Sequence, residues 1–216
     1  MLAGLRDLSN DAACDAVVEL LNRGVAPQSV WDAVFVGAGE VLMRERKIVG
    51  LHAVTTANAL HFAYQTSGHD ETRRMLLLQA AAFLPHFRDA GASRGQLADV
   101  NLEKLEPLPL GAAGDQATAD ILADISRDKM AASRKVLTYV QEHPQPTEMI
   151  DAARLLIFLK GSDAHDYKFS SAVFEDYLNV SPAWRGRYLA ASPFWLRGSG
   201  AADNSLVERT RAALKG

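Results

Sequence analysis

The chain has 216 residues, of which 48% are hydrophobic and 23% charged, values typical of a globular protein with one sizeable core. Its formal net charge of −3 gives no electrostatic reason to expect nucleic acid or an anionic membrane as a partner. The single cysteine, Cys14, excludes an internal disulfide, a Cys-x-x-Cys redox pair and a zinc site built from several thiolates.

The first residues lack the basic and apolar regions of a secretory signal. No apolar run approaches the roughly 20 residues needed to span a bilayer. We therefore expect a cytoplasmic protein that has neither a membrane nor a nucleic acid as its partner, and no pattern indicates an oligomeric state.

Capping residues mark four helices in the first half of the chain. Ser9 or Asn10 caps the first helix, Gly24 ends it, and Pro27 opens the second. Gly37 and Gly39 each lower the propensity of the second helix by about 1 kcal/mol relative to alanine, which indicates that another helix comes close there. Pro85 is expected to end or kink the fourth helix. The predicted ranges are 11–23, 27–46, 52–64 and 70–84.

A long irregular segment separates these helices from those that follow. Residues from about 90 to 115 lack helical periodicity and contain Pro107, Pro109 and several glycines, so we expect a surface excursion with about one turn of helix. Short helices are expected to open at Pro182 and Pro193. The remaining helices are predicted over 116–124, 126–142, 147–160, 163–178 and 205–214.

The sequence predicts an all-α fold, a single-domain multi-helix array or bundle over residues 1–216. Apolar and polar residues never alternate for long, and no Asn-Gly or Asp-Gly hairpin turn is present. Residues 60–70 align without gaps on residues 156–166, with Leu, Phe, His and Asp matching. This similarity leaves open a duplicated helix-pair unit.

Aromatic side chains gather in the short helices near residue 190. We expect them to pack as a lid over the long helices, each burying about 150–250 Å². The alternative is that they line a pocket for an aromatic substrate. The residues are Trp184, Tyr188, Phe194 and Trp195.

Histidines are the most suggestive chemical feature of the chain. His143 lies in a polar Gln-Glu-His-Pro turn and is expected to be solvated. His52 and His61 are nine residues apart, which in one helix is about 13 Å of rise and half a turn. Both can bind one ion only if the helix breaks near residues 50–55, and Asn58 shares a face with His61 and can donate a hydrogen bond to it. His86 follows Pro85, where we expect a helix end from which a side chain can reach inward.

His165 and Lys168 stand three residues apart in the predicted first turn of a helix, so they share a face. Ala172 and Glu175 continue that face, which looks partly apolar. A lysine in apolar surroundings tends to lose its proton, and its amine can then act as a nucleophile or take up carbon dioxide to become an anionic ligand. The alternative is an exposed Lys168 with no chemical role.

Several enzyme classes lack their motifs here. The chain has no paired Glu-x-x-His of di-metal bundles, no His-Glu-x-x-His, no Cys-x-x-Cys-His, no Gly-x-Ser-x-Gly and no nucleotide-binding glycine loop. A haem site with one histidine ligand needs no motif and stays open.

The runs Leu51-His52-Ala-Val-Thr-Thr-Ala-Asn-Ala-Leu-His61-Phe-Ala-Tyr and Met75-Leu-Leu-Leu-Gln-Ala-Ala-Ala-Phe resemble segments of questin-oxidase-like proteins, over about a third of the chain. The resemblance implies a helical oxygenase acting on anthraquinone-type aromatics, with a non-haem iron held by histidines and a carboxylated lysine. His52 matches the first histidine of that family, and His165 and Lys168 match its late histidine and lysine. His61 or His86 is then required to complete the set.

The leading hypothesis is therefore a metal-dependent oxidoreductase of the oxygenase type, with Fe(II) bound by His52, His165, Lys168, and His61 or His86, and with a small aromatic or other organic substrate. The alternative is a non-catalytic helical scaffold or protein-interaction module whose histidines are structural.

Overall fold

The computed structural model describes residues 1–215, and 74% of the chain is helical, with no strand among the residues described. The all-α prediction is confirmed. Within residues 1–215 no helix is both long enough and apolar enough to cross a membrane. The α-helices are α1 Leu2–Leu5, α2 Asn10–Asn22, α3 Pro27–Glu45, α4 Ile48–Thr66, α5 Asp70–Ala92, α6 Gly114–Arg127, α7 Lys129–Glu142, α8 Thr147–Lys160, α9 Ala164–Asn179, α10 Pro182–Ala190 and α11 Ser205–Ala213, with 3₁₀ turns at Leu102–Lys104 and Ser192–Phe194.

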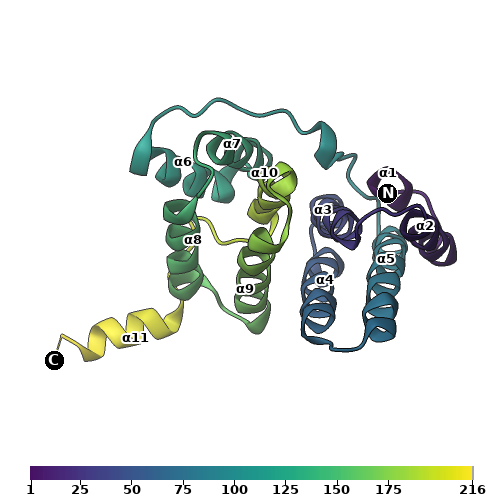
Figure 1. Cartoon of the computed structure of the whole chain (residues 1–216). Coiled ribbons are helices and arrows are strands. Elements are labelled where there is room, and N and C mark those ends of the chain that lie inside the picture. Colours follow the sequence, from purple (N-terminus) through teal and green to yellow (C-terminus); the bar gives the residue numbers. More distant parts are fainter. Residues whose placement is uncertain (216) are drawn as a thin grey trace.

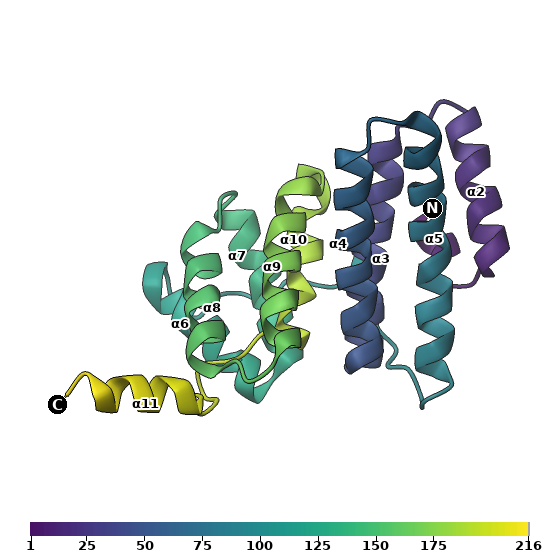
Figure 2. The same cartoon turned by 90° about the horizontal axis from the view of Figure 1, so that it is seen from below.

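The helices form two groups that lie side by side (Figures 1 and 2). Helices α1–α5 form one group and α6–α10 the other, and the segment 93–113 crosses from α5 to α6 along one edge (Figure 1). Helix α4 packs against α9, and α3 packs against α10. A continuous hydrophobic cluster runs through both groups, from Leu2 to Leu196.

Helix α3 is the centre of the first group, and fourteen of its nineteen residues are buried. Its two inner glycines mark close approaches, as expected. A Cβ at Gly37 would lie 2.9 Å from Leu84 Cδ1, and a Cβ at Gly39 would lie 3.0 Å from Ala191 Cβ. These neighbours are side-chain atoms, one from α5 and one from the residue that follows α10. The two glycines therefore make room for side chains, and not for the backbone of another helix.

Side-chain caps begin α2, α7, α9 and α11, and those of α2 and α9 are where the sequence indicated. Ser9 accepts a hydrogen bond from the Ala12 N–H at the start of α2, and Asp163 accepts from the His165 and Asp166 N–H groups at the start of α9. Asp128 caps α7 through the Met130 and Ala131 N–H groups, which places the break between α6 and α7 at residue 128.

Helix α5 does not end at Pro85, so the predicted helix end there was wrong, and of the two alternatives only a kink remains. The helix continues to Ala92 with Pro85 buried inside it. Proline removes one N–H and leaves the Ala81 carbonyl without its usual helical partner. The apolar face of α5 packs against α2, α3 and α4, and this packing outweighs the lost hydrogen bond. The short helix α1 was missed because four residues carry no periodicity.

The aromatic residues near position 190 pack onto the helical core. Tyr188 and Phe194 are 1% and 2% exposed, and Trp184 and Trp195 are half-buried against the same core. Tyr188 meets Phe35 of α3 edge to face, with ring centroids 5.8 Å apart. These side chains therefore cover the long helices, as expected of a lid.

Candidate functional site

His52 and His165 lie next to each other where the two helix groups meet. His52 is in the first turns of α4 and His165 in the first turn of α9. Their ring centroids are 5.8 Å apart, and the ring planes are inclined by 38°. An imidazole centre lies about 3.2 Å from a metal bound through one nitrogen at about 2.1 Å, so two rings on one tetrahedral ion have centres roughly 5–6 Å apart. The observed spacing fits two ligands of one ion.

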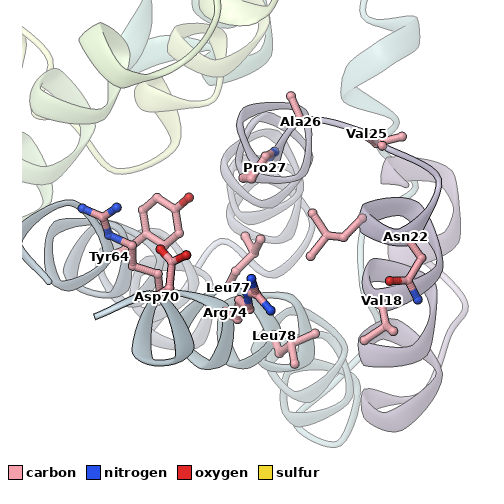
Figure 3. A pocket seen from close by; sticks show the side chains of 13 residues that line it. Val18, Asn22, Val25, Ala26, Pro27, Tyr64, Asp70, Arg74, Leu77 and Leu78 are labelled. Atoms are coloured by element: carbon pink, nitrogen blue, oxygen red, sulfur yellow. The ribbon is translucent and has the colours of Figure 1, made fainter. Parts of the chain in front are cut away.

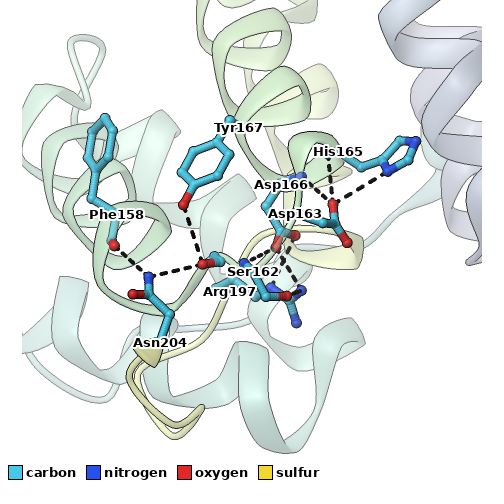
Figure 4. A network of polar contacts seen from close by, with 9 residues as sticks. Phe158, Ser162, Asp163, His165, Asp166, Tyr167, Arg197 and Asn204 are labelled. Atoms are coloured by element: carbon cyan, nitrogen blue, oxygen red, sulfur yellow. Dashed lines mark hydrogen bonds and ion pairs between the residues drawn. The ribbon is translucent and has the colours of Figure 1, made fainter. Parts of the chain in front are cut away.

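The first turn of α9 is fixed by two aspartates (Figure 4). Asp163 Oδ1 accepts from the His165 N–H at 2.7 Å and lies 3.4 Å from His165 Nδ1. Asp166 is buried and binds Arg197 at 2.7 Å and the Ser162 N–H at 2.9 Å. His165 therefore projects from a well-held helix start, with the Asp163 carboxylate beside its Nδ1.

The start of α4 is fixed by the corner between α3 and α4. Glu45 Oε2 accepts from the N–H groups of Lys47 at 2.9 Å and Gly50 at 2.8 Å. A Cβ at Gly50 would lie 2.7 Å from the Leu42 Cα, so only glycine fits there. His52 follows two residues later on an exposed face.

Burial and nearby basic side chains both act on His52. Partial desolvation lowers the pKa of His52, and the nearby His165, Lys168 and Arg94 lower it further because they repel a second positive charge. At neutral pH this ring is uncharged, and a neutral imidazole is the form that binds a metal. Backbone hydrogen bonds from His165 and Asp166 lower the pKa of Asp163, so its carboxylate stays ionised beside His165.

Lys168 lies near the pair but not in the apolar surroundings that we expected. Its side chain is exposed to solvent, as is Glu175 two turns further along α9. Ala172, one turn after Lys168, is buried together with Phe169 and Val173, so the buried stripe of α9 borders Lys168 without including it. The expectation was wrong because the amphipathic stripe of α9 passes beside Lys168 rather than through it.

His61 and His86 lie apart from this pair. His61 is 4% exposed and packs edge to face against Trp31 and Phe35, with ring centroids at 4.8 Å and 5.0 Å. Burial lowers its pKa. His86 is exposed on α5 beside Phe83 and Phe87. Within residues 1–215 no three His, Cys, Asp or Glu side chains gather closely enough to hold a metal.

Helix α4 is continuous from Ile48 to Thr66, without the break near residues 50–55 that would let His61 join His52. Asn58 does not bond His61. Its amide donates to Asp176 at 2.9 Å and to Glu175 at 3.2 Å. His143, expected in solvent, is half-buried and stacks on Tyr139 with ring centroids 4.3 Å apart.

A buried carboxyl between the helix groups was not predicted. Asp176 of α9 is 0% exposed, and it accepts from Asn58 of α4 and from the Tyr188 hydroxyl of α10 at 3.1 Å. Burial raises the pKa of Asp176 to about 7. Asp176 follows Val173 by three residues and precedes Tyr177 on the apolar stripe of α9. A carboxyl group at such a position is the sequence signal that could have revealed its burial.

A cavity of about 660 Å³ lies at the opposite end of α4 from His52 (Figure 3). Apolar side chains of α2 and α5, among them Val18 and Leu77, form its walls. Asp70, Arg73 and Arg74 also line it, so basic residues outnumber acidic ones there. Tyr64 lines it and is twelve residues, or about 18 Å along the helix, from His52. A molecule bound there does not reach the histidine pair.

No family model, no curated protein and no solved structure matches this chain. The resemblance to questin-oxidase-like proteins therefore depends only on the residues quoted for it.

Proposed function

We propose that this protein binds a divalent transition metal ion between α4 and α9, with His52 and His165 as ligands. The observation that supports this most directly is the 5.8 Å spacing of the two rings, which come from residues 113 positions apart in the chain. Imidazole nitrogen favours zinc, copper, iron and nickel. The lowered pKa of His52 keeps its lone pair free at neutral pH.

Asp163 is suited to orient His165. A carboxylate beside Nδ1 favours the tautomer with its proton on that nitrogen, which leaves the lone pair on Nε2 for the metal. A carboxylate this close to Nδ1 makes the imidazole a stronger ligand and favours one orientation of its ring. Asp163 is thus a positioning residue in this proposal.

Lys168 is the proposed source of an anionic third ligand; its side chain is exposed, so this role depends on the bound metal, and not on apolar surroundings, to favour the neutral amine. Its amine, once deprotonated, attacks carbon dioxide, an N–C bond forms, and a second proton leaves the nitrogen, which yields a carbamate. This reaction replaces a positive charge beside the pair with a negative one. The resemblance to questin-oxidase-like proteins supports this role.

Two imidazoles and a carbamate leave coordination positions open. With iron, such a site supplies oxygen chemistry, so we propose an oxygenase-like activity on a small aromatic or other organic molecule. The exposure of His52 means that this molecule approaches from the surface where α4 and α9 meet.

Metal titration tests the site directly. Protein purified without a histidine tag is titrated with Co²⁺ in bicarbonate buffer, followed by its visible absorption. We expect His52→Ala and His165→Ala each to weaken binding by about 100-fold, and Lys168→Arg to weaken it because arginine does not form a carbamate. His86→Ala is the matched control, an exposed histidine away from the pair. Wild-type binding no tighter than that of His165→Ala would reject the site.

Dioxygen uptake tests the finer proposal. Iron-loaded protein supplied with a hydroxyanthraquinone is expected to consume dioxygen, and His165→Ala is expected to abolish the uptake. A site that binds metal without dioxygen uptake under these conditions would count against the oxygenase and leave the metal site in place.

The second candidate is a non-catalytic helical scaffold. It is favoured by the packing of His61 among aromatic rings and by the stacking of His143 on Tyr139, both of which are structural uses of histidine. On this alternative His52 and His165 are surface residues, and the Co²⁺ titration gives no difference between wild type and the histidine variants.

A further inference from the structure

The cavity beside α2 and α5 lies outside the metal proposal and has a volume of about 660 Å³. A volume of this size falls in the range of sites that hold small organic molecules. Figure 3 shows Tyr64 and Asp70 on one side of the space, Val18 and Asn22 on the other, and Pro27 above them. Residues of α2, α3, α4 and α5 therefore line one common space.

The walls of the cavity are largely apolar. Leu77 of α5 is buried, and Leu21 of α2 and Leu78 of α5 are half-buried. Val18 of α2 is 44% exposed. An apolar molecule in the cavity would displace water from these side chains, which favours its binding.

Two arginines of α5 give the cavity a positive side. Arg73 and Arg74 line it, and among residues 1–215 neither guanidinium lies within ion-pair distance of a carboxylate. The Nε of Arg73 donates to the Ser67 carbonyl at 2.8 Å, which leaves both Nη groups for a ligand. The side chain of Arg74 is exposed. Both arginines can therefore donate hydrogen bonds to a bound anion.

The lining includes one carboxylate, Asp70, which does not cancel this charge. Asp70 is the first residue of α5, so its negative charge lies at the positive end of that helix. Helix α3 also begins at the cavity, where Ala26 and Pro27 belong to the lining and no side chain caps its first N–H groups. Outside the lining, Arg23 and Glu19 of α2 balance each other as an ion pair at 3.4 Å. The cavity is therefore positive on balance, which favours an anion.

Tyr64 is held in place beside the arginines. Its ring meets Trp31 of α3 edge to face, with ring centroids 5.3 Å apart, and the Cζ of Arg73 lies 5.9 Å from its centroid. These contacts fix one wall of the cavity before any ligand binds, which lowers the entropy lost on binding.

We propose that this cavity binds a small organic carboxylate with an apolar body. A planar carboxylate matches the guanidinium group, which can donate two parallel hydrogen bonds to it. Its single negative charge also matches the lining, where two arginines face one aspartate. The apolar body then lies against Leu21 and Leu77. The metal proposal does not enter into this inference.

Isothermal titration calorimetry on the full chain tests the proposal with two probes, octanoate and octan-1-ol. The probes have the same number of carbon atoms, and only octanoate is charged. We expect octanoate to bind at least about tenfold more tightly than octan-1-ol, because the arginines stabilise the anion alone. Equal affinities for the two probes, or no binding of octanoate up to about 5 mM, would overturn the proposal.

Three variants locate the binding. Arg74→Gln is expected to weaken the binding of octanoate about tenfold and to leave that of octan-1-ol unchanged. Val18→Trp fills the space from an exposed position of the wall and is expected to weaken the binding of both probes. Arg23→Gln is the matched control, an exposed arginine of α2 outside the lining, and should bind both probes as the wild type does.

All three substitutions are at exposed side chains, so we expect each variant to fold, which circular dichroism checks. Octanoate that binds folded Val18→Trp as tightly as the wild type would place its site elsewhere and reject the cavity. Unchanged binding of octanoate by folded Arg74→Gln would reject the role of the arginine and with it the preference for an anion.

Discussion

At the scale of single residues, Asp176 is a carboxyl group with no exposed surface. It is buried between α4, α9 and α10, and desolvation outweighs the two hydrogen bonds that it accepts. With a pKa of about 7 in the folded protein and about 3.9 in the unfolded chain, it takes up a proton on folding between roughly pH 4 and 7. The folded state binds more protons there, so this residue makes stability fall as pH rises through that window.

We therefore expect Asp176→Asn to remove a component of the pH dependence. The free energy of unfolding of the variant, measured by urea denaturation at several pH values, should lose less on going from pH 4.5 to 7 than that of the wild type. The difference is at most about 1.4 kcal/mol per pH unit. Asp151→Asn, at an exposed carboxylate, is the control and should run parallel to the wild type. If the free energy of unfolding of Asp176→Asn also changes with pH in parallel with the wild type, Asp176 is ionised in the folded protein.

At the scale of elements, buried charge connects helices that are distant in sequence. Glu40 lies in the middle of α3, is 3% exposed, and accepts from Arg6 at 2.7 Å and from the Leu102 N–H at 2.8 Å. One carboxylate thus holds α1 and the segment 93–113 against α3. The positive charge of Arg6 offsets part of the free energy that it costs to bury the Glu40 carboxylate.

Removing that partner is expected to be costly. Arg6→Ala leaves the Glu40 carboxylate buried with only the backbone donor, and we expect a loss of about 3 kcal/mol in the free energy of unfolding. Glu103→Gln removes the more exposed carboxylate that also pairs with Arg6, and should cost less than about 1 kcal/mol. The comparison is made by urea denaturation. Equal losses of free energy in Arg6→Ala and Glu103→Gln would show that the ion pair between Arg6 and Glu40 adds little to stability.

The sequence predicted most elements because helix ends are local. Asp163 and Ser9 accept hydrogen bonds from N–H groups in the first turn of their helices. Such a cap can be recognised from the local sequence without knowledge of the fold. The course of α5 past Pro85 was not predictable in this way, since it depends on packing against three other helices.

In the candidate site, too, some features followed from the local sequence and others depended on how the helices pack. The adjacency of His52 and His165 was assumed from the resemblance and could not be derived, because it depends on how α4 packs on α9. The separation of His61 from His52 followed from helical rise once α4 was continuous, which the sequence had left open. The burial of Glu40 and Asp176 was not anticipated, because charged residues are usually exposed and local patterns do not reveal distant donors.

At the scale of the whole molecule, burial is very uneven among the helices. Helix α3 has fourteen buried residues of nineteen, whereas α2 has two of thirteen. Amides in the most buried element open only when the whole structure unfolds, and those in a peripheral helix open by local fraying. We expect hydrogen exchange measured by mass spectrometry to be at least about tenfold slower in peptides of α3 than in those of α2. Equal rates would indicate that both helices open only by global unfolding.

The burial of α3 also bears on how the protein is made. Phe35 of α3 is covered by Tyr188 of α10, and Gly39 faces Ala191, so the cover arrives about 150 residues later in the chain. At about 5–20 residues per second, a ribosome needs roughly 8–30 s to supply it. During that interval α1–α5 can collapse together, but the surface of α3 that will receive α10 stays open to water. Nascent chains of this protein should therefore bind a holdase chaperone until α10 has emerged.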